Sequence, residues 1–490
     1  MIFNSLEFLI FLPIVLLFHF FTPTKYRWIP LLILSYYFYM YWDKKLIVLI
    51  LFTTIVSYFS AILIERTDKK AVKKLYLLAT LITSLGVLVF FKYYNFLAGS
   101  VTGVISAFGG GEFDLTLDLI LPVGISFYTF QTLSYVIDVY RGDIQAEPHF
   151  GYYALFVSFF PQLVAGPIER PSNLLPQLKE EHKFNRNEFI NGLGIALVGF
   201  FKKIVAADII AVYVNAVYND ASNATGLSVL AATVLFAIQI YCDFSGYTDI
   251  AIGCARMMGI GLMQNFNRPY IAESIKEFWS RWHISLSTWF RDYIYIPLGG
   301  NRRGKWRKHL NVMIVFLVSG LWHGAAWTFV LWGALHGMYQ VIGELTKEPK
   351  AKLYAKLGIN TDSKLFHFGK RAVTFALTCF AWIFFRANSF SDLGILISKL
   401  FTDWKTGIDY ITGSVSFMGL DLVMILAIII SVYILTRFDR RSTNDIFGLD
   451  TNGNTVTSTV GYAQLIWMVI AAALVIASGD GESTFIYFQF

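Results

Sequence analysis

The chain has 490 residues, of which 56% are hydrophobic, 17% aromatic and only 15% charged, and its mean hydropathy is +0.55. Soluble globular proteins carry about 25% charged residues, so this composition excludes a soluble enzyme, a disordered protein and a disulfide-rich secreted scaffold. The formal net charge of +7 is therefore interpreted as the basic loop charge of a polytopic membrane protein. No nucleic-acid partner is expected.

Apolar runs suited to transmembrane or re-entrant helices recur along the chain, and a full span needs roughly 20 mainly apolar residues. The runs are 2–21, 28–42, 46–64, 75–91, 119–140, 152–168, 189–201, 227–251, 310–321, 327–342, 372–385, 420–436 and 460–477. Several are short or contain Gly and Pro, which is typical of re-entrant segments beside a cavity. The sequence predicts an all-α, polytopic integral membrane protein of about 11–13 transmembrane or re-entrant helices.

The first apolar run lacks a basic start and a small-residue cleavage site, so it is expected to be a retained span and not a signal peptide. Three runs precede the densest early basic stretch, Arg66–Lys74. Basic loops collect on the cytoplasmic side of a membrane. We therefore expect the N-terminus to lie outside the cytoplasm.

Two familiar signatures do not hold. The loop Gly299–Lys305 has the spacing of a phosphate-binding loop, but Trp306 stands where a magnesium-ligating Ser or Thr belongs. The three cysteines, Cys242, Cys254 and Cys379, lack metal-ligand spacing. Neither nucleotide hydrolysis nor a metal site is expected.

Histidines inside the apolar runs are the first candidates for chemistry, because an ionisable group in a membrane is costly and marks function by default. His323 lies in Leu310–Gly343, a stretch without any Asp, Glu, Lys or Arg. Its neutral imidazole suits the removal of a proton from a hydroxyl that attacks an activated acyl group. The alternative is a buried histidine that forms hydrogen bonds across helices.

Two further histidines lie nearby in the sequence. Read as one helix, Phe278–Trp289 places Ser280, His283 and Ser287 on a single stripe. An interfacial amphipathic helix explains the same spacing. His336 lies within a GxxxG face, for which helix packing is the favoured interpretation.

These motifs together carry a resemblance. Trp322–Gly324 combined with Phe278–Ser285 resembles the membrane-bound O-acyltransferase family, and is most similar to its bacterial branch of alginate-type O-acetylation. Further segments resemble that branch in the same order: Pro122–Gln131, Phe160–Ile168, Tyr241–Tyr247 and Asn265–Tyr270. The resemblance extends over Leu119–Arg386. It implies one membrane domain, with N-terminal spans in 1–118, a catalytic core in 119–386 and C-terminal spans in 387–490.

The resemblance also implies a mechanism. His323 matches the principal catalytic histidine and His283 the second motif position, and the helices are expected to surround a central tunnel. Acetyl-CoA is the implied acyl donor, with no permanently bound cofactor. The implied partner is an extracytoplasmic SGNH-type acyltransferase or another polysaccharide-modifying protein. Such proteins reside among the lipids of the bacterial inner membrane.

Other polar residues support weaker hypotheses. Tunnel-lining positions are assigned to Tyr128, Gln131, Asp243 and Ser287, for which interhelical hydrogen bonding is an equal alternative. Contacts with donor phosphates are assigned to arginine and lysine side chains that otherwise serve as interfacial cations, namely Arg268, Arg281, Arg302, Arg303 and Lys305.

Besides a sterol or lipid acyltransferase, which is less favoured, two other functions stay open at this point. The first is D-alanyl transfer from a carrier protein to teichoic acid, a type that resembles this chain only as far as about Arg386. The second is a polysaccharide or lipid exporter, which is expected to show repeat symmetry or several intramembrane carboxylates.

Overall fold

The computed structural model describes residues 1–109, 114–163 and 166–440. Its regular elements within these ranges are all helical, which confirms the predicted all-α class. The chain forms two compact units. The first combines Met1–Ala196 with Tyr247–Met263, and the second combines Leu197–Gly246 with the described residues from Gln264 onward. The predicted run 460–477 lies outside the described residues.

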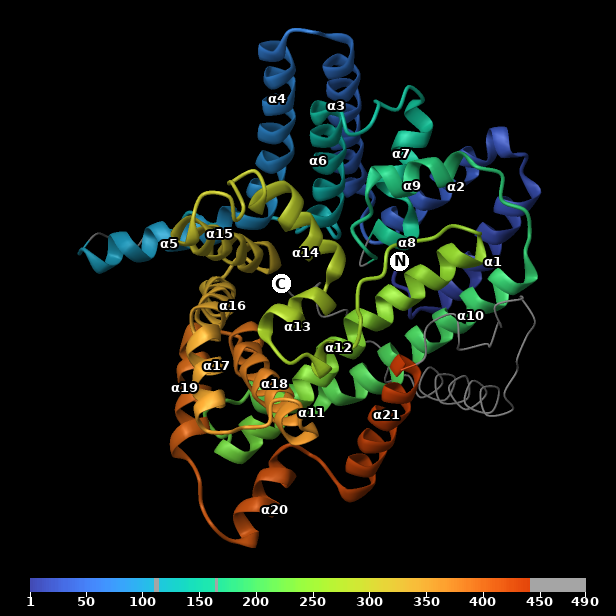
Figure 1. The fold of residues 1–490 in the computed structure, drawn as a ribbon. Helices are drawn as coiled ribbons and strands as arrows, with labels where there is room; N and C mark the ends of the chain where they lie inside the picture. The colour runs from blue at the N-terminus through green and yellow to red at the C-terminus, as the bar shows by residue number, and fades with distance from the viewer. Residues whose placement is uncertain (110–113, 164–165, 441–490) are drawn as a thin grey trace. The chain divides into compact units, whose positions relative to one another are not determined.

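The first unit contains the N-terminal helices (Figure 1). These are α1 (Leu6–Phe21), α2 (Thr24–Met40), α3 (Ile47–Arg66), α4 (Lys70–Leu88), α5 (Tyr94–Ala107), α6 (Ile125–Arg141), α7 (Phe150–Ser158), α8 (Phe160–Leu163), α9 (Pro171–Lys179) and most of α10 (Arg186–Phe200). Helices α3, α4 and α6 lie side by side. The hydroxyls of Thr54 and Ser57 on α3 are buried, and they donate hydrogen bonds to carbonyls one turn earlier, at 2.6 Å each. A buried polar side chain is tolerated because its hydrogen bond is made within the helix.

The second unit contains both histidines of the sequence motifs, His283 and His323. Its helices are α11 (Asp208–Tyr218), most of α12 (Gly226–Met257), α13 (Ile275–Arg281), α14 (Ile284–Phe290), α15 (Lys305–His323), α16 (Trp327–Leu345), α17 (Lys347–Lys356), α18 (Lys364–Arg386), α19 (Phe390–Thr402), α20 (Ile408–Phe417) and α21 (Leu422–Arg440). Serine side chains cap the starts of α13, α18 and α19, where Ser274, Ser363 and Ser389 each accept a hydrogen bond from a backbone N–H of the first turn. Such caps satisfy donors that would otherwise lack a partner.

Shorter turns of other helix types interrupt the α-helices. Within the described ranges, two are 3₁₀ turns, at Lys44–Leu46 and Pro269–Ile271. Three are π-helical, at Val89–Tyr93, Phe201–Ala207 and Arg291–Tyr295. π-helical turns occur mostly inside α-helices and frequently at functional sites.

Several helices suit a lipid bilayer. Among the described residues, four stretches are long and apolar enough to cross a membrane: Lys44–Arg66, Lys70–Ala107, Gly226–Met257 and Lys364–Arg386. A bent pair, Ile408–Phe417 with Leu422–Leu435, is a fifth candidate, with an angle of 72° between its halves. Helix α1 is apolar but has only 16 residues.

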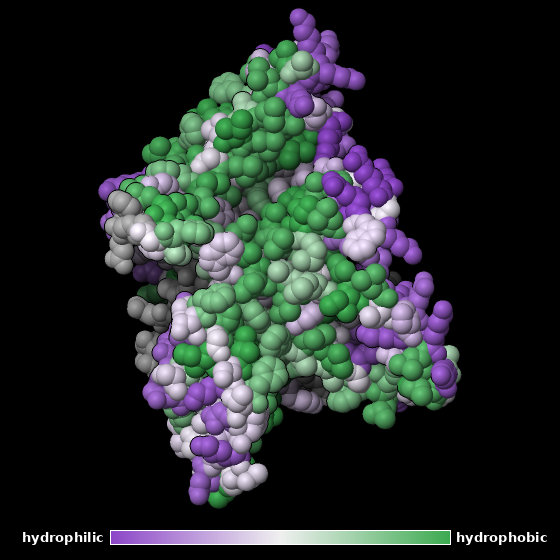
Figure 2. Space-filling model, turned by 90° about the vertical axis from the view of Figure 1, so that its left-hand side faces the viewer, coloured by the Kyte–Doolittle hydropathy of each residue, from purple (hydrophilic) through white to green (hydrophobic). Residues whose placement is uncertain are grey.

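Hydrophobic side chains cover much of the molecular face in Figure 2, and hydrophilic side chains gather along its borders. Large apolar residues that are exposed include Val48 and Phe52 on α3 and Leu75 and Ile82 on α4. An apolar exterior of this extent is expected for a protein whose solvent is lipid. The chain is a multi-pass membrane protein.

Candidate active site

The close crossing of α15 and α16 positions His323. A Cβ added at Gly320 would lie 2.3 Å from the carbonyl oxygen of Phe329, and one added at Gly333 would lie 2.2 Å from that of Phe316. Only glycine permits this approach of two backbones. Because His323 is the last residue of α15, the crossing brings it against the first turns of α16.

His323 is enclosed by aromatic rings. Its side chain is buried, and its ring centroid lies 4.9 Å from that of Trp332 and 5.5 Å from that of Phe385, both near edge-on. The ring of His283 lies 6.3 Å away, centroid to centroid. The structure therefore brings together the two histidines that the sequence motifs single out.

The predicted single helix over Phe278–Trp289 is wrong. Helix α13 ends at Arg281 and α14 begins at Ile284, with His283 between them at a φ of +45°. The break arises because the N–H of Ile284 donates to the carbonyl of Asn265, at 2.9 Å, and not to a carbonyl one turn earlier. A non-glycine residue in the left-handed region is strained and persists only where its surroundings hold it. His283 is one of two such residues in the described chain, the other being Arg268 at +48°.

The segment that follows α12 holds His283 in place. The N–H of Asn267 donates to the carbonyl of Arg281 at 2.9 Å. Together with the bond from Ile284 to Asn265, it makes two backbone hydrogen bonds between this segment and the chain around His283. The side-chain oxygen Oδ1 of Asn265 lies 3.2 Å from Nδ1 of His283. Phe244 packs against the imidazole with ring centroids 4.7 Å apart.

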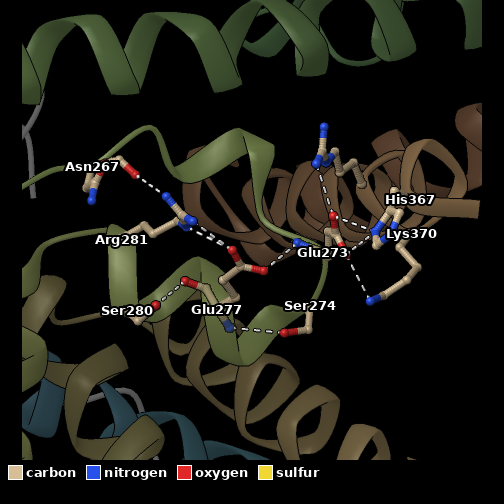
Figure 3. A network of polar contacts seen from close by, with 9 residues as sticks. Asn267, Glu273, Ser274, Glu277, Ser280, Arg281, His367 and Lys370 are labelled. Atoms are coloured by element: carbon tan, nitrogen blue, oxygen red, sulfur yellow. Dashed lines mark hydrogen bonds and ion pairs between the residues drawn. The ribbon is translucent and has the colours of Figure 1, made fainter. Parts of the chain in front are cut away.

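A charged network fixes the same segment from its other end (Figure 3). The carboxylate of Glu273 accepts hydrogen bonds from Nδ1 of His367 at 2.9 Å, Nζ of Lys370 at 3.0 Å and Nη2 of Arg371 at 3.0 Å, all on the first turns of α18. These contacts lower the pKa of Glu273 to about 2, and the hydrogen bond from His367 has the largest effect. The carboxylate therefore stays charged and ties the segment before α13 to α18.

His336 is placed in the packing role that its GxxxG pattern predicts. A Cβ at Gly337 would lie 2.8 Å from Sδ of Met313 on α15. Nε1 of Trp279 donates a hydrogen bond of 3.2 Å to Nδ1 of His336, and the ring of Trp332 lies 5.1 Å away. This histidine links α13 to α16.

The four residues proposed for the tunnel fall in different surroundings. Asp243 on α12 is buried and forms an ion pair with Nζ of Lys203 at 2.8 Å. Lys203 lies in the π-helical turn Phe201–Ala207. Ser287 on α14 donates to the carbonyl of Trp282 at 3.3 Å. Tyr128 and Gln131 are buried on α6 in the first unit, where Nε2 of Gln131 donates to the carbonyl of Phe156 at 2.7 Å.

The basic residues proposed for donor phosphates also differ. Arg281 is bound within the structure, because Nη2 lies 2.9 Å from the carboxylate of Glu277 and Nη1 donates to the carbonyl of Asn267 at 3.2 Å. Arg268 is half-buried before the 3₁₀ turn. Arg302 and Arg303 are exposed in the loop before α15, and the exposed Lys305 is the first residue of that helix. Among the described residues, no group of His, Cys, Asp and Glu side chains is arranged to hold a metal ion.

Comparison with known proteins decides the family. The model of the membrane-bound O-acyltransferase family matches residues 143–349. A probable alginate O-acetylase of Pseudomonas putida is 35% identical over 503 residues, covering 100% of both chains. The chain belongs to the membrane-bound O-acyltransferase family. It is thus an acyltransferase, which removes the exporter from consideration.

Two further relatives carry different names within this family. A peptidoglycan O-acetyltransferase of Helicobacter pylori is 36% identical over 389 residues, covering 73% of this chain and 71% of the relative. A teichoic acid D-alanyltransferase of Streptococcus thermophilus is 32% identical over 266 residues, covering 51% of this chain and 61% of the relative. Membership of the family therefore establishes O-acyl transfer and does not by itself identify the acyl group.

The sequence does not predict how the site is enclosed. Asn265 stands out in the sequence only as part of a family-like segment, and Trp332 and Phe385 do not stand out at all. The charge-free sequence around His323 gives a signal for burial, but aromatic partners on α16 and α18 carry no local pattern that distinguishes them from other core residues.

Proposed function

We propose that this protein transfers an acetyl group from cytoplasmic acetyl-CoA toward the O-acetylation of an extracytoplasmic polysaccharide, by way of a partner acyltransferase of the SGNH type. The supporting observation is the buried pair of His323 and His283, with ring centroids 6.3 Å apart. The similarity to alginate and peptidoglycan O-acetylating relatives supports acetyl as the acyl group. The bacterial inner membrane, with the N-terminus outside, is the location that fits basic cytoplasmic loops.

In this proposal His323 removes the proton from the attacking hydroxyl, and His283 positions the thioester donor. The hydroxyl oxygen forms a bond to the acyl carbon as the carbon–sulfur bond breaks, and the proton ends on the departing sulfur. General base catalysis of this kind contributes about 10²- to 10⁴-fold to a rate. The aromatic enclosure of His323 supports the role, since it keeps water from competing with the hydroxyl.

The exposed basic loop at the start of α15 is assigned to recruitment of the donor. Lys305 and His323 stand at opposite ends of a helix of 19 residues, which spans about 27 Å. Cations at this distance act on the phosphate end of a long donor and not on its thioester. Guanidinium and ammonium groups both suit that contact.

The experiment is an acyl-transfer assay with purified protein in proteoliposomes. Radiolabelled acetyl-CoA is supplied on one side, and labelled ester is measured with and without the purified partner and polysaccharide. We expect transfer by the wild type and its loss in His323→Ala. His336→Phe, which alters a buried histidine assigned to packing, is the matched control and is expected to retain transfer.

The second candidate function differs in its donor. The teichoic acid relative aligns with about half of this chain, so D-alanyl transfer remains the alternative. The same proteoliposomes are therefore also supplied with D-alanine bound to a carrier protein. Transfer of D-alanine without transfer of acetyl, or full acetyl transfer by correctly folded His323→Ala, would refute the proposal.

A further inference from the structure

One side-chain oxygen beside the histidine pair receives several hydrogen bonds. Oδ1 of Asn265 accepts from the backbone N–H of Ser285 at 3.2 Å and from Oγ of Ser285 at 2.9 Å. The same oxygen lies 3.2 Å from Nδ1 of His283. All of these atoms are buried with their residues.

The backbone N–H of Ser285 fixes which atom of Asn265 faces the histidine. A peptide N–H only donates, so the amide atom next to it must be the oxygen and not the NH₂ group. An amide oxygen carries no proton. Nδ1 of His283 must therefore donate the hydrogen bond that joins the two side chains.

This contact determines the tautomer of His283. A neutral imidazole carries one N–H, and when that proton is on Nδ1 the other nitrogen, Nε2, has a free lone pair. Nε2 of His283 is buried and has no hydrogen-bond partner among the residues that the structure describes. The ring that carries it lies beside Phe244 and His323, with centroids 4.7 and 6.3 Å away.

The backbone prevents the ring from escaping this arrangement. Asn265 binds His283 through its side chain and binds the next residue, Ile284, through its own carbonyl at 2.9 Å. The carbonyl of His283 accepts from the N–H of Ser287, also at 2.9 Å, at the start of α14. The left-handed φ of +45° at His283 is thus held from both sides. Strain of this kind is retained where surrounding contacts impose it.

We propose that Asn265 is a positioning residue which fixes His283 as the Nδ1–H tautomer, so that Nε2 accepts a hydrogen bond from the substrates. The inference rests on the proposed role of the histidine pair in acyl transfer, and it specifies that role. Nε2 of a neutral His283 can hold an N–H of the donor or the O–H of the acceptor. It cannot donate to the thioester carbonyl.

The first test observes the tautomer directly and needs no activity. Protein labelled with ¹⁵N at histidine is examined by solid-state NMR in bilayers, and the His283 signals are identified by their absence in His283→Gln. We expect a protonated Nδ1 and an unprotonated Nε2 in the wild type and in Asn265→Asp, whose carboxylate keeps the acceptor. A wild-type ring protonated only on Nε2 would overturn the inference.

The second test is kinetic. Asn265→Ala is expected to lower kcat/KM for acyl transfer about 10- to 100-fold, as loss of a partner that orients a functional histidine does. Asn265→Asp should restore most of that loss. Ser285→Ala is the matched control, because it removes one donor from the same oxygen without touching His283, and a change below about threefold is expected.

A double-mutant cycle separates positioning from a general structural effect. If Asn265 acts through His283, Asn265→Ala adds little to the loss already caused by His283→Gln. Losses that multiply, or an Asn265→Asp variant as impaired as Asn265→Ala, would contradict the inference. Where Asn265→Ala does not fold, the spectra of the wild type and Asn265→Asp still decide it. The expected tautomer without any acetyl transfer would refute the proposed function and leave the tautomer assignment standing.

Discussion

Two polar clusters in the second unit position the same stretch of chain in opposite ways. Around Glu273 three basic side chains bind one carboxylate, and all four groups are partly exposed (Figure 3). Around His323 and His283 the neighbours are mainly aromatic rings, and both imidazoles are buried. In the first cluster, the single carboxylate is bound by all three basic side chains. In the second cluster, aromatic rings surround both imidazoles, and the side-chain oxygen of Asn265 binds His283.

The difference separates a structural cluster from a chemical one. A carboxylate that already accepts hydrogen bonds from three basic side chains is occupied by the protein itself, and its contribution is to hold α18 against the segment before α13. The Nε2 atom of His283 is buried and has no hydrogen-bond partner among the described residues. Burial of such a polar atom lowers stability, so its presence indicates a function. We therefore expect changes in the histidine pair to affect activity more than stability, and changes around Glu273 to do the reverse.

The largest expected effect is that of His323→Ala. We expect a fall in kcat of about 10²- to 10⁴-fold, because the general base is lost, with little change in thermal stability. Initial rates of acyl transfer and the melting temperature in detergent measure the two quantities. A large fall in melting temperature together with a small fall in rate would place His323 in the structural class instead.

The next effect is expected at the crossing of α15 and α16. Gly333→Ala places a Cβ 2.2 Å from the carbonyl oxygen of Phe316, so the helices must separate. Overpacking of this kind costs about 1–3 kcal/mol, and it should also lower activity because His323 and Trp332 move apart. Gly343→Ala on the same helix has no atom within 4 Å of the new Cβ and is the control. Equal behaviour of the two variants would show that the crossing does not position the site.

Glu273→Gln should lower the melting temperature at pH 7 and change activity only modestly. The pKa of Glu273 is lowered from 4.5 to about 2 by its bonds to His367, Lys370 and Arg371. A lowered pKa means that the stabilisation is fully present above pH 4.5 and is lost as the pH falls toward about 2. The difference in melting temperature between wild type and variant should therefore shrink from pH 7 to pH 3. The exposed Glu348→Gln is the control, and a difference that does not depend on pH would exclude this electrostatic origin.

The smallest effect on activity is expected for Trp279→Phe. The substitution removes the N–H that binds Nδ1 of His336 at 3.2 Å and keeps an aromatic ring in the packing. Loss of one buried hydrogen bond should cost about 1–3 kcal/mol, and activity should stay within about threefold because His336 is assigned to packing. A loss of activity comparable to that of His323→Ala would assign chemistry to His336.

Part of the site follows from the sequence alone. The charge-free stretch around His323 and the motif at His283 identify both histidines, because a polar residue in an apolar run is detectable from the sequence. The helix predicted through His283 fails for a physical reason. A stripe of residues predicts a helix only if each backbone N–H finds its partner one turn earlier, and at Ile284 the partner is instead the carbonyl of Asn265.

The glycines also show which features the sequence predicts and which only the structure reveals. Gly333 and Gly337 fit a GxxxG face from spacing alone, and the structure confirms their close contacts with α15. Gly320 lies at the same crossing, but glycine is required there only because the carbonyl oxygen of Phe329 leaves no room for a side chain. Nothing in the sequence near Gly320 contains that information.

The sequence by itself determined that the chain is helical, resides in a membrane and carries isolated histidines, because composition and apolar periodicity act locally. Only the tertiary structure decided which side chains enclose those histidines and which hydrogen bonds orient them. A hydrogen bond of 3.2 Å joins the side chains of Asn265 and His283. The rings of His323, Trp332 and Phe385 meet from three helices. Contacts of this kind depend on how the backbones pack, and packing is a property of the whole unit.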